Sequence, residues 1–240
     1  LHADRMIFGR PDRAFPDHPF WGPDIDPDVL ARLADEDGFP FGRVDERLLF
    51  EELADELMRG RIIGWMDGAT EFGPRALGAR SIIAAPHDVA MRDRLNRDIK
   101  YREEFRPFAP VVAAEHAERF FDLPPGGARL GRFMSGVFPV RPEWREHLAA
   151  VTHVDGTARV QVLPPDMAPR LGRLLDAYGR RSGIAVLLNT SFNLAGEPIV
   201  NTVAEGWSTF RRSGIDLLVA GPVCVRKQRE TQPLSLEDVA

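Results

Sequence analysis

The sequence predicts a single α/β domain in which helices flank a twisted, mixed β-sheet. Short apolar runs of strand length alternate with segments of helical periodicity along most of the 240 residues. The Asp155-Gly156 dipeptide lies between two β-like runs and is a strong hairpin signal, so we expect antiparallel pairs in the sheet. The chain shows no internal repeat and no heptad run.

Composition suggests the boundaries of this domain. Residues 1–22 are rich in Pro, Asp and aromatics without periodicity, and they read as a lead-in or a linker from a missing N-terminal domain. Residues 23–228 carry the alternating elements, and residues 229–240 form a C-terminal tail. The first residue is Leu rather than Met, so we expect the chain to be part of a longer polypeptide.

Capping signals and apolar runs predict the elements of the first half. Asp26 offers an N-cap, Pro27 suits the first helical position and Gly38 is a stop, which together predict a helix. Apolar residues at helical spacing predict another helix that ends at Ile99 and presents Lys100 at its C-terminal end. The expected elements are helices over 27–35, 45–59, 88–99 and 115–121, and strands within 61–66, 81–86 and 107–114.

The second half follows the same logic. The segment PPGGARLG at 124–131 has two prolines and three glycines in eight residues, and we expect a flexible loop there. Asp155-Gly156 would join two of the three β-like runs that follow, and Gly183 would close a helix. The expected elements are strands within 133–140, 149–154, 157–163, 184–192 and 215–225, and helices over 168–182 and 204–213.

Composition also restricts function. A formal net charge of −5 and an isoelectric point near 5.7 argue against a general nucleic-acid or membrane surface. No run reaches the roughly 18 to 20 apolar residues of a membrane span, and the start lacks a secretory signal. Cys224, the single cysteine, lies in an apolar run and reads as a buried structural thiol rather than a nucleophile. We therefore expect a cytoplasmic protein with no nucleic-acid or membrane partner.

Basic residues gather in a short stretch between Glu71 and Pro110. Only two of the 31 basic residues of the chain are lysines, Lys100 and Lys227. An ammonium is a compact charge suited to one phosphate oxygen, whereas a guanidinium is a planar fork for phosphate or carboxylate. The stretch reads as an anion site, and the alternative is a solvated helix face laced with ion pairs, because acids are interspersed. Its cations are Arg75, Arg80, Lys100, Arg102 and Arg106.

Polar segments follow several predicted strands, and strand ends are where ligands bind in α/β sheets. Neither a Walker pattern nor a GxGxxG fingerprint occurs, so spacing alone gives only a phosphate-site hypothesis. These segments are 69–81, 100–110, 153–161 and 189–198.

Two of these segments carry candidate binding groups. In the third segment, alternate residues on extended backbone would share one polar face, which would consist of His153, Asp155, Thr157, Arg159 and Gln161. The alternative is a hairpin exposed to solvent. The other histidines lack zinc-type spacing and no GxSxG elbow is present, so we predict no metal site and no hydrolase triad. In the fourth, short amides and hydroxyls could bind phosphate, ribose or an amide-like group, or simply form turns: Asn189, Thr190, Ser191 and Asn193.

Four motifs occur in register between about Trp21 and Val225: EFGPRALGARSI, DRLNRDIKYREEFRPFAPVV, THVDGTARVQ and LLNTSFNLAGEPIV. Together they closely resemble the C-terminal half of the O-carbamoyltransferases of the NodU/CmcH family, which modify antibiotics and Nod factors. In that family this half is a YrdC/Sua5-like domain that makes carbamoyl adenylate from ATP, with Mg²⁺, and carbamoyl phosphate. A preceding Kae1-like domain, which holds iron or another metal, then passes the carbamoyl group to a hydroxyl of a small-molecule acceptor.

The resemblance implies roles for individual residues. Lys100, Arg106 and Arg75 are the expected catalytic cations, because phosphoryl and nucleotidyl transfer need positioning and charge neutralisation more than a nucleophile. The 124–131 segment could serve as a lid. The residues expected to bind substrate or nucleotide are Arg75, Arg80, Lys100, Arg106, His153, Asp155, Thr157, Arg159, Asn189, Ser191 and Asn193.

The resemblance also implies that the chain alone is an incomplete transferase. The Kae1-like domain is expected either in cis, in a longer polypeptide, or as a partner chain. One alternative is a threonylcarbamoyl-adenylate synthase of the Sua5/YrdC type, against which the acidic composition counts. The other is a non-catalytic nucleotide-binding module, against which the retained cations count.

Overall fold

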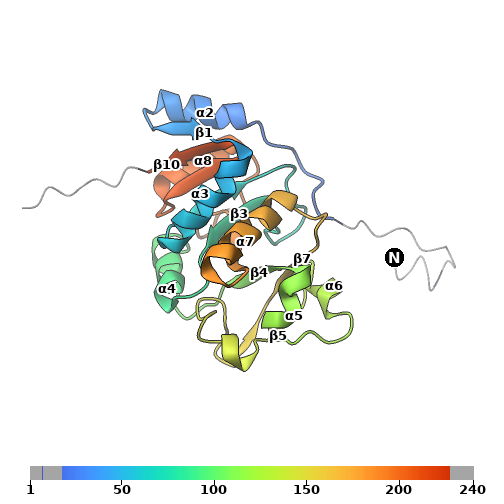
Figure 1. Cartoon of the computed structure of the whole chain (residues 1–240). Helices are drawn as coiled ribbons and strands as arrows, with labels where there is room; N and C mark the ends of the chain where they lie inside the picture. Colours follow the sequence, from blue (N-terminus) through green and yellow to red (C-terminus); the bar gives the residue numbers. More distant parts are fainter. Residues whose placement is uncertain (1–6, 8–17, 228–240) are drawn as a thin grey trace, which may run out of the picture.

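An eight-stranded mixed sheet forms the centre of the molecule (Figure 1). The structure is a computed structural model that describes residue 7 and residues 18–227. The strand order is β1-β10-β9-β2-β3-β8-β4-β7, in which the β2–β9 and β4–β7 pairs are parallel and the other neighbours are antiparallel. The predicted α/β domain with a mixed sheet is therefore confirmed, while the expected C-terminal tail and most of the lead-in lie outside the described residues.

The elements alternate along the chain as the apolar runs and caps predict. The strands are β1 (Phe41–Arg43), β2 (Ile63–Met66), β3 (Arg80–Ala84), β4 (Ala109–Ala113), β5 (Phe138–Pro139), β6 (Thr157–Ala158), β7 (Gln161–Leu163), β8 (Val186–Ser191), β9 (Leu217–Ala220) and β10 (Val223–Arg226). The α-helices are α2 (Pro27–Glu36), α3 (Glu46–Met58), α4 (Val89–Asp98), α5 (Ala117–Phe120), α6 (Gly127–Gly131), α7 (Pro169–Ser182) and α8 (Val203–Arg212). Two 3₁₀ turns, Ala114–His116 and Pro142–Trp144, precede α5 and follow β5.

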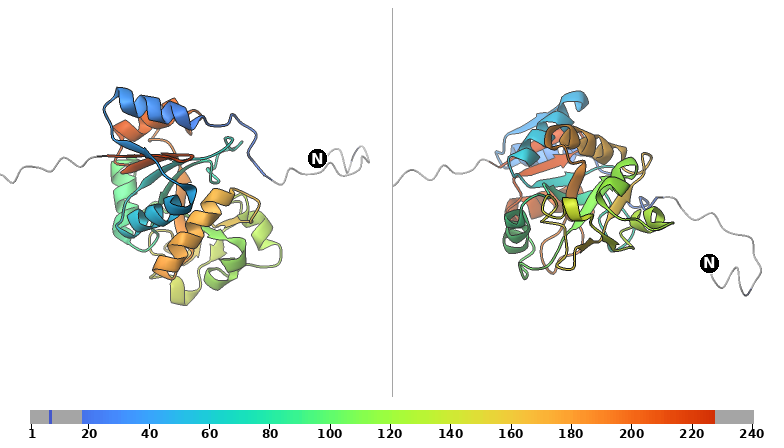
Figure 2. Two further views of the ribbon diagram at one scale, coloured as in Figure 1. Left: turned by 45° about the horizontal axis from the view of Figure 1, so that its top comes forward. Right: turned by 60° about the horizontal axis from the view of Figure 1, so that its bottom comes forward.

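Helices cover both faces of the sheet (Figure 2). On one face α3 and α7 pack against alternate strand residues such as Ile63, Trp65 and Ile83. On the other face α2, α4 and α8 pack against the opposite set, which includes Ile82 and Ala84. Side chains of a strand point alternately to the two faces of the sheet. A sheet that is covered on both faces therefore needs strands that are apolar at successive positions, and the apolar runs of the sequence have this pattern.

Three local predictions were wrong. The segment 149–154 is a series of turns rather than a strand, because Leu148, Ala150 and Val151 are buried without extended backbone, and an apolar run alone does not distinguish these cases. The Asp155-Gly156 turn exists, but β6 pairs with β5 instead of that segment. The 124–131 segment, expected as a loop, contains helix α6.

The helix explains why that segment is not an open loop. Helix α6 begins after Gly126, whose left-handed backbone (φ 80°) suits glycine, and it packs its glycines closely. A Cβ on Gly131 would lie 2.6 Å from a methyl carbon of Val162, so this glycine allows α6 to rest directly on β7. The strand β1 was missed by the sequence analysis because it has only three residues, all exposed at the sheet edge.

Two buried charged side chains fix the loop between β2 and β3. Glu71 accepts hydrogen bonds at Oε1 from the backbone N–H groups of Leu77 (2.7 Å), Ala79 (3.0 Å) and Arg80 (3.2 Å). The Arg80 guanidinium is fully buried and donates to five backbone carbonyls: Pro23, Asp67, Gly68, Ala79 and Asn201. Glu71 and Arg80 therefore set the conformation of the loop that carries Arg75.

We predict that Glu71→Ala lowers the free energy of unfolding by about 3 kcal/mol, because three backbone donors lose a charged acceptor at a buried position. Urea denaturation followed by circular dichroism measures the change. Glu143→Ala, at an exposed position, is the matched control and should be close to neutral. A Glu71→Ala chain as stable as the control would contradict the anchoring role.

Candidate functional site

Two adjoining pockets lie where the polar segments of the sequence converge, and we call them the inner and the outer pocket. The inner pocket has a volume of about 130 Å³, and its lining includes Arg75, Arg102, Phe108, Met134, Arg159 and Asn189. The outer pocket has a volume of about 430 Å³, and its lining includes Lys100, Tyr101, Glu103, Arg106, Asn193 and Gly196. Arg102, Thr190 and Ser191 line both pockets, so the two form one continuous cleft.

Positive charge dominates the inner pocket. Among the described residues, no carboxylate forms an ion pair with Arg75, Arg102 or Arg159, and the Arg75 and Arg159 side chains donate no hydrogen bond. Burial lowers the pKa of Arg159, and the charge of Arg75 lowers it further. Burial and the charge of Arg106 likewise lower the pKa of Arg102. Guanidinium groups without counterions in one pocket provide a site for an anion.

The end of α4 places Lys100 deep in the outer pocket. Its side chain is only 7% exposed, and Nζ donates to Ser191 O (2.7 Å), Asn193 Oδ1 (2.7 Å), Asn193 O (3.0 Å) and Ser191 Oγ (3.3 Å). Asn193 Oδ1 also accepts from Ser191 Oγ (2.7 Å), and Asn193 Nδ2 donates to Glu197 O (2.7 Å). Lys100 thus holds the loop after β8 as well as lining the cleft.

The environment of Lys100 brings its pKa close to neutral pH, so its charge depends on pH and on what binds beside it. Burial, with a smaller contribution from Arg102, lowers the pKa of Lys100 to about 7. The four surrounding oxygens favour the charged form, but burial outweighs them. A bound anion beside Nζ would restore the charged form.

Asn96 shapes the loop that follows Lys100. Its buried side chain donates to the carbonyls of Glu104 (3.0 Å) and Arg106 (3.0 Å) and accepts from Arg102 Nε (2.7 Å). The Arg102 guanidinium lies 4.8 Å from the centre of the Phe108 ring. These contacts hold Arg102 between the two pockets, a position that the sequence analysis, which counted it only as part of the cluster, did not predict.

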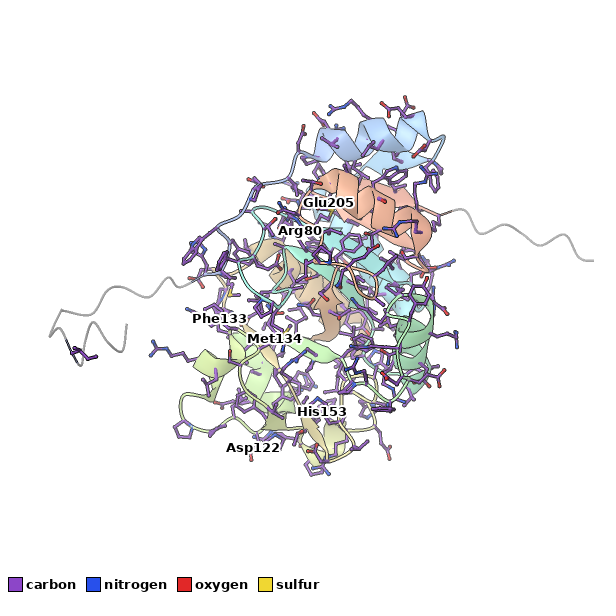
Figure 3. All side chains as sticks on the ribbon, turned by 180° about the vertical axis from the view of Figure 1, so that it is seen from behind. Arg80, Asp122, Phe133, Met134, His153 and Glu205 are labelled. Atoms are coloured by element: carbon purple, nitrogen blue, oxygen red, sulfur yellow. The ribbon has the colours of Figure 1, made fainter. Side chains whose placement is uncertain are left out.

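The structure separates some expected site residues from others. Lys100, Arg106, Ser191 and Asn193 line the outer pocket, and Arg75, Arg159, Asn189 and Ser191 line the inner one. Arg80 lines neither, because all its donors are engaged by backbone carbonyls, so its expected anion-binding role is corrected to an anchoring one. Figure 3 shows Arg80 well separated from His153.

The polar face expected over 153–161 is also corrected. The backbone turns at Asp155-Gly156, so His153, Asp155 and Thr157 bond to one another instead of lining a strand face. His153 Nδ1 lies 3.0 Å from Thr157 Oγ1, and Thr157 Oγ1 donates to Asp155 Oδ1 (2.7 Å). Burial lowers the pKa of His153. None of these three lines either pocket.

Three further features of the described residues lie outside the proposed anion site. Glu115, His116 and Asp176 bring one ligand atom each within 4.8 Å of one another, but all three are exposed and lie outside the cleft. No helix in the described ranges is long and apolar enough to cross a membrane. Cys224 is buried and has a pKa raised to about 11, which fits the predicted structural thiol.

Comparison with known proteins identifies the family. A family model described as carbamoyltransferase C-terminus matches residues 54–227. The chain belongs to the carbamoyltransferase C-terminus family. Nodulation protein NolO of Bradyrhizobium diazoefficiens is 41% identical over 91% of this chain, and 3'-hydroxymethylcephem-O-carbamoyltransferase of Amycolatopsis lactamdurans is 39% identical over 71%. The predicted resemblance to the NodU/CmcH carbamoyltransferases is thereby confirmed.

The match covers only part of each relative. This carbamoyltransferase C-terminal domain spans 39% of the nodulation protein and 32% of the cephem carbamoyltransferase. A solved structure of full-length HypF in a phosphate- and nucleotide-bound form superposes on 72% of this chain and 24% of its own, with a TM-score of 0.50 and 16% identity. That likeness concerns the fold alone and supports the YrdC-like assignment.

We predict that anion binding at pH 8 takes up as much as about one proton. Free Lys100, with a pKa of about 7, is mostly neutral at pH 8, and a neighbouring anion raises its pKa and returns the proton. Sulfate is the probe because it does not titrate in this range, and calorimetry in buffers of different ionisation enthalpy gives the proton count. The uptake should vanish at pH 5.5, where Lys100 is already charged, and in Lys100→Met. Sulfate binding at pH 8 without proton uptake would contradict the prediction.

Proposed function

We propose that this domain activates carbamoyl phosphate with ATP, forming carbamoyl adenylate for transfer of the carbamoyl group to a hydroxyl of a small-molecule acceptor. The observation that carries the proposal is the cleft in which three guanidinium groups, those of Arg75, Arg102 and Arg159, have no counterion in the described residues. Both substrates bring phosphate, and the family membership points to carbamoyl transfer.

The sizes of the pockets suggest how the substrates would divide. The inner pocket, about 130 Å³, suits a compact phosphorylated carbamoyl group beside Arg75, Arg102 and Arg159. The outer pocket, about 430 Å³, has room for nucleotide phosphates beside Lys100 and Arg106. Arg102 and Ser191 line both pockets and would contact the reacting groups at their junction.

The chemistry requires charge stabilisation and, after one hydrolytic step, exclusion of further water. Water would first cleave carbamoyl phosphate into phosphate and carbamate, and a carbamate oxygen would then attack the ATP α-phosphorus while pyrophosphate leaves. The arginines would neutralise charge on the phosphate oxygens, which are the atoms that gain charge in such transfers. Shielding of the inner pocket from solvent would protect the labile carbamate, and a lid role for the 124–131 segment, which contains α6, stays a prediction.

Magnesium fits this arrangement as a companion of the nucleotide. Within the described lining of the cleft, Glu103 is the one carboxylate. Mg²⁺ is commonly held by one or two carboxylates together with substrate phosphates and water, so Glu103 would be the protein ligand. When bound, the ion would neutralise phosphate charge.

The remainder of a longer polypeptide or a partner chain would complete the transferase. The relatives are about two and a half to three times as long as the region matched here, which leaves room for the expected Kae1-like domain with its iron or other metal and its acceptor site. Phe72 (79% exposed) and Phe105 (71% exposed) lie on the two loops that carry Arg75 and Arg106. Such exposed aromatics beside a cleft suit a surface that another domain covers. We place this enzyme in the cytoplasm.

The proposal is tested by incubating the chain with ATP, Mg²⁺ and carbamoyl phosphate and measuring pyrophosphate and carbamoyl adenylate by mass spectrometry. Product should depend on carbamoyl phosphate. Product formed only with threonine and bicarbonate would support a threonylcarbamoyl-adenylate synthase instead. Tight nucleotide binding without either product would support a non-catalytic module.

We predict that Arg102→Ala lowers kcat/KM for carbamoyl phosphate by about 100- to 1000-fold, or about 3–4 kcal/mol, because it removes a fixed charged contact at the junction of the pockets. Pyrophosphate release measures the rate. Arg180→Ala is the matched control, since Arg180 is exposed and pairs with Glu51 outside the cleft. Equal rates in the two variants would remove Arg102 from the reaction.

A further inference from the structure

Asn189, which lines the inner pocket, carries an unpaired hydrogen-bond acceptor. The residue lies on β8, is 1% exposed and lines the pocket. Its Nδ2 donates to Gln161 Oε1 (2.6 Å) and Ala76 O (3.2 Å). Its Oδ1 is buried and has no hydrogen-bond partner. A buried amide oxygen without a donor costs free energy, so its retention points to a group that it meets in the working protein.

The neighbouring hydrogen bonds fix which way the Asn189 amide faces. Gln161 is fully buried and its Nε2 donates to Leu77 O (2.8 Å), so Gln161 Oε1 must face Asn189. Asn189 must then direct its Nδ2 donor toward Gln161 Oε1, and the same nitrogen donates to the Ala76 carbonyl oxygen. Rotating the Asn189 amide would bring its oxygen against two other oxygens. The unpaired Oδ1 is therefore imposed by its surroundings.

A second buried atom of the same pocket is also unpaired, and it has the opposite character. Arg159 Nε is a donor without a partner, and Arg159 lines the inner pocket with Asn189. An unpaired donor and an unpaired acceptor complement an amide, whose carbonyl accepts and whose amino group donates. The other cations of the pocket suit the phosphate that such a ligand would carry.

We propose that Asn189 Oδ1 accepts a hydrogen bond from the amino group of the carbamoyl substrate, and that Arg159 Nε donates to its carbonyl, so that Asn189 selects a carbamoyl phosphate over an acyl phosphate of the same shape. This inference rests on the proposed function. The inference adds to the proposed function that one side chain, Asn189, distinguishes an NH₂ group from a CH₃ group on the substrate. Gln161 acts on that discrimination only through Asn189 and is a positioning residue.

The physical basis is the cost of leaving a buried acceptor unpaired. A site built to bond an N–H rejects an analogue that lacks it far more strongly than an apolar pocket rejects a methyl group. A methyl group beside Asn189 Oδ1 would leave the oxygen desolvated without a donor. We therefore expect a preference of at least about tenfold for the amide over the matched ketone.

Two stable phosphonates test the proposal. Phosphonoacetamide and 2-oxopropylphosphonate differ only in NH₂ against CH₃, and both place a carbonyl two bonds from the phosphorus. Titration calorimetry gives the ratio of their dissociation constants for the wild-type chain, Asn189→Leu and Arg159→Lys. Inorganic phosphate, which has neither group, is titrated in parallel to report on the cationic part of the pocket.

The wild type should prefer the amide by about tenfold or more, and Asn189→Leu should bind both phosphonates about equally. Arg159→Lys should weaken both alike and keep the preference, because the carbonyl is common to the two. Equal binding of both phosphonates to the wild type, with phosphate still bound, would overturn this inference and leave the proposed function standing. That comparison needs no variant, so it remains decisive if Asn189→Leu fails to fold. Absence of phosphate binding in the wild type would instead overturn the proposed function.

Discussion

The organisation of this protein depends on positive charge that its own carboxylates do not neutralise. Arg75, Arg102 and Arg159 converge on one small pocket, and no described carboxylate pairs with them, although ion pairs are numerous elsewhere, for example between α3 and α7. Burial, and after it the repulsion between like charges, raises the free energy of these cations, which lowers the pKa values of Arg102 and Arg159. A bound anion would relieve this cost, which favours the proposed binding of phosphate.

Hydrogen bonds to backbone and amide groups, rather than ion pairs with the arginines, hold the loops that carry Arg75 and Arg102. The side chain of Asn96 forms hydrogen bonds with Arg102, Glu104 and Arg106 in the loop that carries Arg102. The Lys100 ammonium donates hydrogen bonds to Ser191 and Asn193 at the end of β8 and in the loop after it. The Glu71 carboxylate satisfies backbone N–H groups of the Arg75 loop instead of pairing with Arg75 itself. Backbone and amide partners fix geometry without consuming positive charge, which leaves the guanidinium groups available to a ligand.

Much of the fold could be predicted from the sequence because local signals determine it. Asp26 with Pro27 marks the start of α2, and Gly183, with φ of 75°, ends α7. The wrong predictions occur where the local sequence is compatible with two different structures. The apolar run 149–154 is buried by turns rather than by an extended strand, and the glycines of 124–131 allow a helix to pack closely instead of loosening a loop.

The site shows the same limit. The motifs predicted which loops meet, and residues of these loops line the two pockets. They could not separate Arg75 from Arg80, which lie five residues apart in one loop, because the difference is which carbonyls surround each side chain. Nor could they show that Arg102 joins the two pockets or that Asn189 keeps a free oxygen, since both facts depend on contacts with distant residues.

A crystal structure of the chain grown with pyrophosphate tests the central claim most directly. This account predicts a pyrophosphate at the junction of the two pockets, with its oxygens within hydrogen-bond distance of Arg102, Arg159 and Ser191. Pyrophosphate bound only elsewhere on the surface, with those side chains turned to carboxylates of the protein, would contradict the account.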